Sequence, residues 1–362
     1  MRTYPVPMVP GPTSVPPEVL AAYQVNYGSS DIETEFFELY ARVQDQLRQI
    51  LLTGNKMAIM TGEGMVALWS GLKSCLRPGD RVLAVATGLF GYGVADMARS
   101  IGADVRVVGF NYDEIANVSR VEEELAAFRP KMLTLIHCET PSGTLNPAAE
   151  IGALVAKYDV PLFYVDAVSS AAGAPLRTDE WNIDLCLIGS QKCLSLPASL
   201  AVVAVSPRAW DIIEEVGYQG YDALLPWRDA LENRFFPYTP YWHGIAALEV
   251  ACRAILREGV EAVLDRHARV AARCRQGLRD LGLELYPRRV EYSSPTVTAV
   301  KVPPIISWAE LDRRLREHGV VLGGNYGPLA DKVFRIGHMG TQADDDLVER
   351  TLNALAEVLR TA

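Results

Sequence analysis

The residue of this sequence best suited to chemistry is Lys192, in the stretch IGSQKCLSLP (188–197). An apolar, strand-like run ends just before it and another apolar stretch follows, so one interpretation is that its side chain is buried. Burial lowers the pKa of an amine, because the charged form loses its solvation. A neutral lysine is the nucleophile that Schiff-base chemistry requires. The alternative is a surface lysine on a loop after a strand, and the rest of the chain must decide between the two.

A second candidate is Asp166, which ends the apolar run FYVD (163–166). A carboxylate at the end of a buried strand is costly unless it meets a cation or a hydrogen-bond donor. It could pair with a protonated pyridine nitrogen, which would turn that ring into an electron sink. It could also simply cap the turn that follows, and the position alone does not separate these interpretations.

Three more strand ends carry groups that could hold a ligand. TGEGMVALWSGL (61–72) places two glycines before a helical pattern, where backbone N–H groups can bind a phosphate. In ATGLFGYGV (86–94), Phe90 lies between glycines and could cover a flat ring. LIHCETPSGTLNP (135–147) contributes the hydroxyl of Thr140. Each has an ordinary alternative, namely a plain turn, a core aromatic or a structural hydroxyl.

These residues must be positioned by a sheet. Short apolar runs alternate with helical segments, and such continuous runs are typical of a mostly parallel sheet that is covered on both faces. In these sheets, ligands bind beyond the carboxyl ends of the strands. A helix is expected over 33–52, from its apolar stripe. The strands are expected at 81–86, 104–110, 131–137, 161–166, 184–189 and 200–205.

After about residue 240 the sequence pattern changes, and the rest of the chain is predicted to form a smaller α+β unit. We therefore predict an N-terminal arm over 1–17, a large domain over 18–245 and a small C-terminal domain over 246–362. The arm is rich in proline and is expected to be extended. In the small domain, the final helix is predicted to begin at Thr341, with Asp344 completing a capping box.

Composition excludes several classes of function. The chain has 362 residues, of which 49% are hydrophobic and 22% charged, and its net charge is −9. That charge argues against nucleic acid or an anionic membrane as a partner. We expect no secretory signal, and no apolar run reaches the ~18 residues of a membrane span. The six cysteines lack CxxC pairs and favour buried, reduced thiols in a cytoplasmic protein. The five scattered histidines suggest no metal site.

In their order and spacing, these motifs resemble the fold-type I pyridoxal-phosphate (PLP) enzymes, and among them the class V aminotransferases of the alanine–glyoxylate and serine–pyruvate branch. The resemblance runs from PGPTSVPPEVL (10–20) to the final helix. It is sharpest at SQK (190–192), at VDAVSS (165–170) and at KVFRIG (332–337), together with the HCETPSGTLNP stretch. It implies an α/β fold with a large PLP-binding domain and a smaller C-terminal α+β domain.

The resemblance also implies roles around the cofactor ring. Lys192 would hold PLP as a Schiff base and later shuttle a proton. Asp166 would pair with the pyridine nitrogen. Val168 would lie under the ring and Phe90 over its other face, while Thr140 would hydrogen-bond the phenolic oxygen.

The phosphate and the substrate would be held by further residues. By resemblance, Gly64, Met65 and Gln191 would hold the phosphate. Thr239 would reach in from a second subunit, which implies a homodimer with its active sites at the interface. Arg335 would bind the α-carboxylate of the substrate, helped by the backbone of Gly28 and Ser29. The implied reaction moves an amino group from a small amino acid, of the alanine or serine type, to a 2-oxo acid such as glyoxylate or pyruvate.

Two residues depart from the family pattern. Glu63 stands where the phosphate loop usually has a small hydroxyl residue, and the Met65 side chain cannot donate a hydrogen bond. Because a carboxylate repels a phosphate dianion, we expect Glu63 to turn away or to meet a cation. Phe236 replaces a tyrosine that often donates to the phosphate.

Two other classes of function were weighed. A PLP-dependent lyase, by β-elimination or C–S cleavage, is the main alternative. Desulfurases of this fold usually carry histidine before the lysine and a mobile cysteine, whereas this chain has Gln191 there and no cysteine between 275 and 335. A β-elimination lyase stays open. A PLP-binding regulator would need a DNA-binding module, for which the chain has no residues to spare. A dicarboxylic donor would need a second cation, for which Arg228 and Arg234 are candidates.

Overall fold

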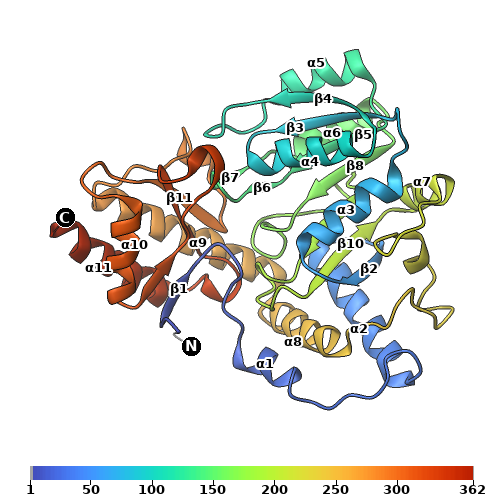
Figure 1. Ribbon diagram of the computed structural model, residues 1–362, viewed down its shortest axis with the longest axis horizontal. Helices are drawn as coiled ribbons and strands as arrows, with labels where there is room; N and C mark the ends of the chain where they lie inside the picture. The colour runs from blue at the N-terminus through green and yellow to red at the C-terminus, as the bar shows by residue number, and fades with distance from the viewer. Residues whose placement is uncertain (1–2, 362) are drawn as a thin grey trace.

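A seven-stranded sheet forms the centre of the larger of two units (Figure 1) in a computed structural model that describes residues 3–361. All its strands are parallel except β10, which runs antiparallel to both of its neighbours. The sheet confirms the predicted α/β fold with a mostly parallel sheet. In spatial order its strands are β2 (Lys56–Thr61), β10 (Leu200–Val205), β9 (Leu185–Gly189), β8 (Leu162–Asp166), β5 (Met132–Ile136), β3 (Arg81–Ala86) and β4 (Asp104–Gly109).

The middle of this sheet is buried on both faces, because every residue of β5, β8, β9 and β10 is buried. Continuous apolar runs require such a cover, which the helices of this unit provide. These helices are α1 (Pro17–Ala22), α2 (Thr34–Leu51), α3 (Gly64–Cys75), α4 (Leu89–Ser100), α5 (Val118–Phe128), α6 (Ala148–Lys157), α7 (Pro207–Val216) and α8 (Trp242–Glu258). The short elements are β6 (Cys138–Glu139), β7 (Thr144–Leu145) and the 3₁₀ turn η1 (Leu225–Trp227).

The smaller unit lies beside the large one and has its own apolar core (Figure 1). The N-terminal arm belongs to this core, since β1 (Val6–Met8) pairs in parallel with β12 and buries Val6 and Met8 there. The other elements are α9 (Val260–Asp280), β11 (Val297–Lys301), α10 (Trp308–Glu317), β12 (Val320–Leu322), β13 (Val333–Gly337) and α11 (Asp345–Arg360). Three 3₁₀ turns join them, namely η2 (Val290–Tyr292), η3 (Gly327–Leu329) and η4 (Gly340–Gln342).

The two apolar cores indicate where the boundary between the units lies. The predicted boundary between 245 and 246 falls inside α8, whose residues Leu248 and Cys252 pack in the larger core. Residues of α9, such as Val270, pack in the smaller core. Gly259, with a φ of +94°, separates the two helices. We therefore propose Gly259 as the boundary, because a helix packed into one core is not divided between two.

The predicted start of the last helix is wrong. Asp344, not Thr341, is the N-cap of α11, and its carboxylate accepts the backbone N–H of Leu347 at 2.9 Å. Thr341 lies in the preceding turn, where its hydroxyl donates to the carbonyl of Ser14 at 2.9 Å. A long-range contact with the N-terminal arm thus takes the residue that local sequence would use as a cap. Within residues 3–361, no helix combines the length and the apolar character that crossing a bilayer requires.

Candidate active site

A pocket of about 130 Å³ opens at the carboxyl ends of the parallel strands. Its walls come from the segments that follow β2, β3, β5, β8 and β9, as expected for a sheet of this kind. The pocket brings together eight predicted site residues that are far apart in the chain. Its lining is Glu63, Gly64, Met65, Leu68, Phe90, Cys138, Thr140, Asp166, Val168, Ser169, Gln191 and Lys192.

Lys192 follows β9, and its Nζ donates to the carbonyl of Pro10 at 2.6 Å. Burial lowers the pKa of this amine, and the positive charge of Arg335 lowers it further. The N-terminal arm covers the lysine closely: a Cβ on Gly11, whose φ is +95°, would lie 2.7 Å from Nζ. Only glycine fits there. The sequence reasoning missed Pro10 and Gly11 as parts of the site, although the PGPT motif holds both.

Asp166 is the last residue of β8 and is only 6% exposed. Burial raises the pKa of its carboxyl to about 6, and the negative charge of Glu63 adds to this, while the Val168 hydrogen bond and Lys192 oppose it. One carboxylate oxygen accepts the backbone N–H of Val168 at 2.8 Å. Among the described residues Asp166 forms no ion pair, so its charge is available to a cation brought by a ligand.

The position of Phe90 depends on Glu139, a residue that the sequence reasoning did not single out. Glu139 is fully buried, and its carboxylate accepts the backbone N–H groups of Phe90 at 3.2 Å and of Gly91 at 2.7 Å. Burial raises the pKa of this carboxyl to about 7. The bonds tie the start of α4 to the segment after β5, so that Phe90 lines the pocket. An acidic residue inside the apolar stretch LIHCE was the signal in the sequence.

A pair of hydroxyl groups also lines the pocket. The Oγ1 of Thr140 and the Oγ of Ser169 are 2.6 Å apart, and both residues are buried. Ser169 was not predicted as a site residue, although it follows Val168 in the VDAVSS stretch. The pair provides a donor and an acceptor beside the position of Asp166.

The loop between β2 and α3 differs from expectation. Glu63 is the N-cap of α3, where one carboxylate oxygen accepts the backbone N–H of Met65 at 2.9 Å. Its other oxygen accepts the side-chain amide N–H of Gln191 at 3.1 Å. The expectation that Glu63 turns away or meets a cation is therefore wrong. Its carboxylate instead accepts hydrogen bonds from Met65 and Gln191, two of the residues that were predicted to hold a phosphate.

Arg335 lies in β13 and is 7% exposed. Its Nε donates to the carbonyl of Gly324 at 2.9 Å, and Nη2 donates to the same oxygen. The ring of Tyr326 lies 5.1 Å from its guanidinium carbon. Burial lowers the pKa of the guanidinium, and in residues 3–361 no carboxylate forms an ion pair with it. A buried guanidinium without an anion is placed to receive one.

The remaining predicted residues lie elsewhere in the single chain. Gly28, Ser29 and Thr239 are exposed. Their two loops lie side by side, since the Thr239 hydroxyl donates to Asp31 at 2.9 Å and the Ser30 hydroxyl donates to the carbonyl of Pro240 at 2.8 Å. Their roles toward a second subunit stay predictions.

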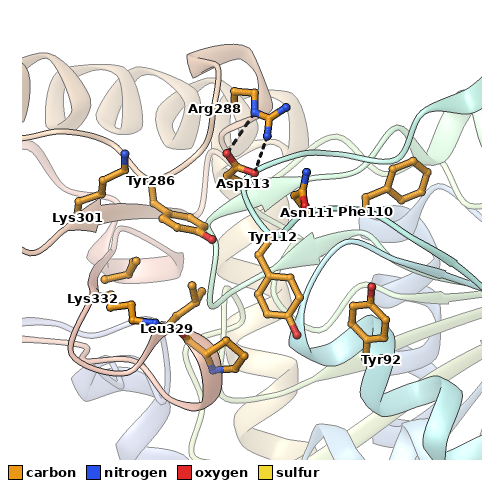
Figure 2. A pocket seen from close by; sticks show the side chains of 12 residues that line it. Tyr92, Phe110, Asn111, Tyr112, Asp113, Tyr286, Arg288, Lys301, Leu329 and Lys332 are labelled. Carbon is orange, nitrogen blue, oxygen red and sulfur yellow. Dashed lines mark hydrogen bonds and ion pairs between the residues drawn. The ribbon is translucent and has the colours of Figure 1, made fainter.

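A wider hollow of about 990 Å³ lies between the two units and is lined by aromatic and charged residues (Figure 2). Arg288 of the small unit forms ion pairs with two residues of the large unit: its Nε lies 3.2 Å from a carboxylate oxygen of Asp113, and it also pairs with Glu114. Lys301 is likewise paired, with Glu284. Arg288 and Lys301 thus have carboxylate partners, whereas Lys332, which also lines the hollow, donates to the carbonyl of Pro328 at 3.1 Å. The ion pairs of Arg288 join the loop after β4 to the small unit.

The chain belongs to the class V aminotransferases, because residues 8–328 match the family model described as Aminotransferase class-V. It is 31% identical to alanine–glyoxylate aminotransferase of Oryctolagus cuniculus, covering 97% of this chain and 91% of the relative. It is 32% identical to pyridoxamine–pyruvate transaminase of Mesorhizobium japonicum, covering 99% and 92%. A crystal structure of alanine–glyoxylate aminotransferase from Nostoc sp. superimposes with a TM-score of 0.94 at 30% identity, covering 99% and 96%. The predicted family, enzyme class and fold are thereby confirmed.

The cofactor of this family is PLP, which confirms the predicted cofactor class. The ring end of the pocket fits it: a buried carboxylate, a buried amine and the side chains of Phe90 and Val168 in the lining suit a flat, protonated pyridine. The end at α3 does not fit a phosphate in the arrangement seen. There the carboxylate of Glu63 takes the hydrogen bonds that a phosphate would need.

Proposed function

We propose that this aminotransferase moves an amino group between a small amino acid, of the alanine or serine type, and a 2-oxo acid such as glyoxylate or pyruvate. The observation that carries the proposal is Arg335, a buried guanidinium without a carboxylate partner whose charge acts on Lys192. The α-carboxylate that amino acids and 2-oxo acids share would supply the missing anion in bidentate form.

Four residues of the pocket lining, together with Arg335, would each have a task in this reaction. Lys192, whose amine has a pKa lowered by burial, would take the proton from the substrate α-carbon and return it. Asp166 would keep a pyridine nitrogen protonated, and Phe90 would hold the ring plane from the face opposite Val168. Arg335 would orient the substrate by its carboxylate. When the pyridoxyl ring is bound, it supplies the electron sink.

The partners of the two candidate second cations support a donor with a small, uncharged side chain. Arg228, a candidate second cation for a dicarboxylic donor, already pairs with Glu214 at 2.9 Å and with Asp229 at 3.2 Å. Arg234 contacts the ring of Phe37 instead. Arg228 therefore already has two carboxylate partners, which supports a donor without a second carboxylate.

We further propose a homodimer in the cytoplasm. The adjacent loops that hold Ser29 and Thr239 are exposed in the single chain, and a second subunit would bring them to its neighbour's pocket. All six cysteines are free and buried, which suits a reducing compartment. Analytical ultracentrifugation tests the dimer, for which a monomer at micromolar concentration would be the contrary result.

The experiment that tests the function is a donor and acceptor panel. Small, acidic and aromatic amino acids are incubated with glyoxylate, pyruvate and 2-oxoglutarate, and the new oxo acid and the new amino acid are both measured. Because one relative is named for pyridoxamine, pyridoxamine belongs among the donors. We expect one new amino acid for each oxo acid formed, with alanine or serine as the best amino acid donor.

The same panel distinguishes a lyase. Release of ammonia and oxo acid without any acceptor would replace the proposal by β-elimination chemistry. The described cysteines do not support sulfur transfer, because burial raises the pKa of each thiol, to about 11 for Cys138 and about 12 for Cys193.

A further inference from the structure

The end of the pocket at α3 presents acceptors where a phosphate would need donors. The backbone N–H of Met65 and the side-chain amide N–H of Gln191 both bond to Glu63, at 2.9 and 3.1 Å. The two donors therefore already have an anion, and it is covalently part of the chain. A ligand phosphate could use them only by displacing this carboxylate and then lying beside it, which like charges oppose.

Gln191 provides an independent observation at the same place. It is 7% exposed, and its carbonyl Oε1 is buried without a hydrogen-bond partner. That oxygen is an acceptor only, since the amide nitrogen is the group that bonds to Glu63. A buried acceptor of this kind calls for a donor from a ligand. The oxygens of a phosphate dianion carry no hydrogen and cannot satisfy it.

The charges of the lining residues also disfavour a phosphate at the end near α3. Among the lining residues named above, Glu63 and Asp166 are acidic and Lys192 is the only cation. Lys192 lies at the ring end and donates to Pro10. No lining cation is therefore left to neutralise a dianion near α3.

We propose that this site takes pyridoxyl ligands without a phosphate, so that pyridoxamine is an amino donor that enters and pyridoxal a product that leaves. The hydroxymethyl group, which stands where PLP carries its phosphate ester, donates to Oε1 of Gln191 or to the Glu63 carboxylate. Its small, neutral oxygen needs no extra cation. The ring end keeps its tasks, with Asp166 at the pyridine nitrogen and Lys192 as the proton carrier. The inference rests on the proposed aminotransferase function and names a donor for it.

The reaction balances without a further reactant. Pyridoxamine and a 2-oxo acid give pyridoxal and an amino acid. The methylene carbon of pyridoxamine loses its amino group and two electrons and becomes an aldehyde, while the keto carbon gains the amino group and a hydrogen. The carbonyl oxygen is exchanged through water. In the reverse direction, a small amino acid converts pyridoxal into pyridoxamine.

The test compares phosphorylated with unphosphorylated ligands in binding and in turnover. The dissociation constants of pyridoxal and PLP are measured by absorbance titration of the purified full-length protein. Borohydride reduction and mass spectrometry then show which form is attached to the peptide that contains Lys192. We expect pyridoxal to bind at least about tenfold more tightly than PLP. Pyridoxamine with pyruvate should give pyridoxal in large molar excess over enzyme.

Two substitutions of Glu63 sharpen the test. Glu63→Ser removes the anion from the N-terminus of α3, and we expect it to shift the pyridoxal-to-PLP affinity ratio by at least about tenfold toward PLP. Glu63→Gln keeps the shape and the acceptor for Met65, and should give an intermediate ratio. The matched control is Asp344→Ser, which removes the carboxylate N-cap of α11 in the small unit. Its ratio should equal that of the wild type, with melting temperatures showing that each variant folds.

The outcomes separate this inference from the function on which it rests. If the wild type binds PLP as tightly as pyridoxal, or if Glu63→Ser leaves the ratio unchanged, the inference is wrong, even when alanine and glyoxylate are transaminated. If pyridoxal is preferred but neither pyridoxamine nor any amino acid donates to a 2-oxo acid, the proposed function and the assignment of pyridoxamine as a donor both fail, and only the preference for unphosphorylated ligands stands.

Discussion

The two ends of the pocket differ in whether their polar groups already have partners within the protein. At the ring end, Asp166 ends one strand and Lys192 follows the adjacent one, both are buried, and within residues 3–361 neither forms an ion pair. At the end near α3, the donors of Met65 and Gln191 are already bonded to Glu63. At the ring end, the ionisable side chains are thus available to a ligand. At the end near α3, the hydrogen-bond donors are already bonded to a carboxylate of the protein. In this fold, the residues that act on a pyridoxyl ring are therefore distinct from those that bind the substituent of the ring near α3, and the two sets can differ independently.

The largest effect is expected at the ring end, from Lys192→Ala. Losing both the nucleophile and the proton carrier should lower kcat for every donor by at least about 10⁴-fold. Lys131→Ala is the matched control, because Lys131 is ion-paired with Asp80 at 2.7 Å, away from the pocket lining. Steady-state rates and borohydride labelling of the peptide around residue 192 are the measurements. Labelling at Lys56, Lys73 or Lys131 would show that the ring end lies elsewhere.

Asp166→Asn should have the next largest effect. The substitution keeps the shape of the side chain but removes the charge that favours a protonated ring nitrogen. We expect kcat to fall by about 100-fold or more while a pyridoxyl ligand still binds, because the electron sink is weakened rather than lost. Rates and absorbance titrations are measured on the same preparation. A variant with nearly normal turnover would reduce Asp166 to a turn cap, and the contrast between the two ends would disappear.

Arg335→Lys tests the substrate side of the ring end. Lysine keeps a positive charge but not two parallel hydrogen bonds, so kcat/KM should fall by about 30-fold for amino acids and 2-oxo acids alike. The affinity for pyridoxal should not change. Arg288→Lys is the control, since Arg288 pairs with Asp113 and Glu114 outside the pocket. Were stability lost in Arg335→Lys but both values of kcat/KM kept, Arg335 would be a structural residue.

The smallest expected effect is a pH dependence of ring binding. The pKa of Asp166 is raised to about 6, so its carboxyl becomes protonated as pH falls through that value and can no longer act as an anion for the ring nitrogen. Pyridoxal affinity should therefore be full above about pH 7 and fall below pH 6 by at most about tenfold per pH unit. Titrations between pH 5 and 8, with Asp166→Asn as control, measure it. An unchanged profile in that variant would assign the dependence to another group, such as Lys192.

Local sequence was enough to predict most of the sheet. Runs such as 81–86 and 200–205 coincide with β3 and β10, because an uninterrupted apolar run has to be buried on both faces. It did not show that β10 runs antiparallel to its neighbours, since direction depends on how the chain returns to the sheet. The proposal of Gly259 in place of a boundary near 245 has a related reason: by sequence α8 is one more amphipathic helix, and its packing supports its assignment to the larger core.

By itself, the sequence determined which residues carry the chemistry: a lysine and an aspartate at the ends of buried strands, and an arginine between apolar neighbours. Burial and strand position follow from local apolar runs, so these residues could be predicted before any fold was known. The tertiary structure alone decided what Glu63 does and what covers Lys192. Glu63 meets Gln191, and Lys192 meets Pro10 and Gly11, only because the folded sheet brings distant segments together. Hydrogen bonds between such segments depend on geometry that no local pattern records, and here they determine which ligand the pocket can hold.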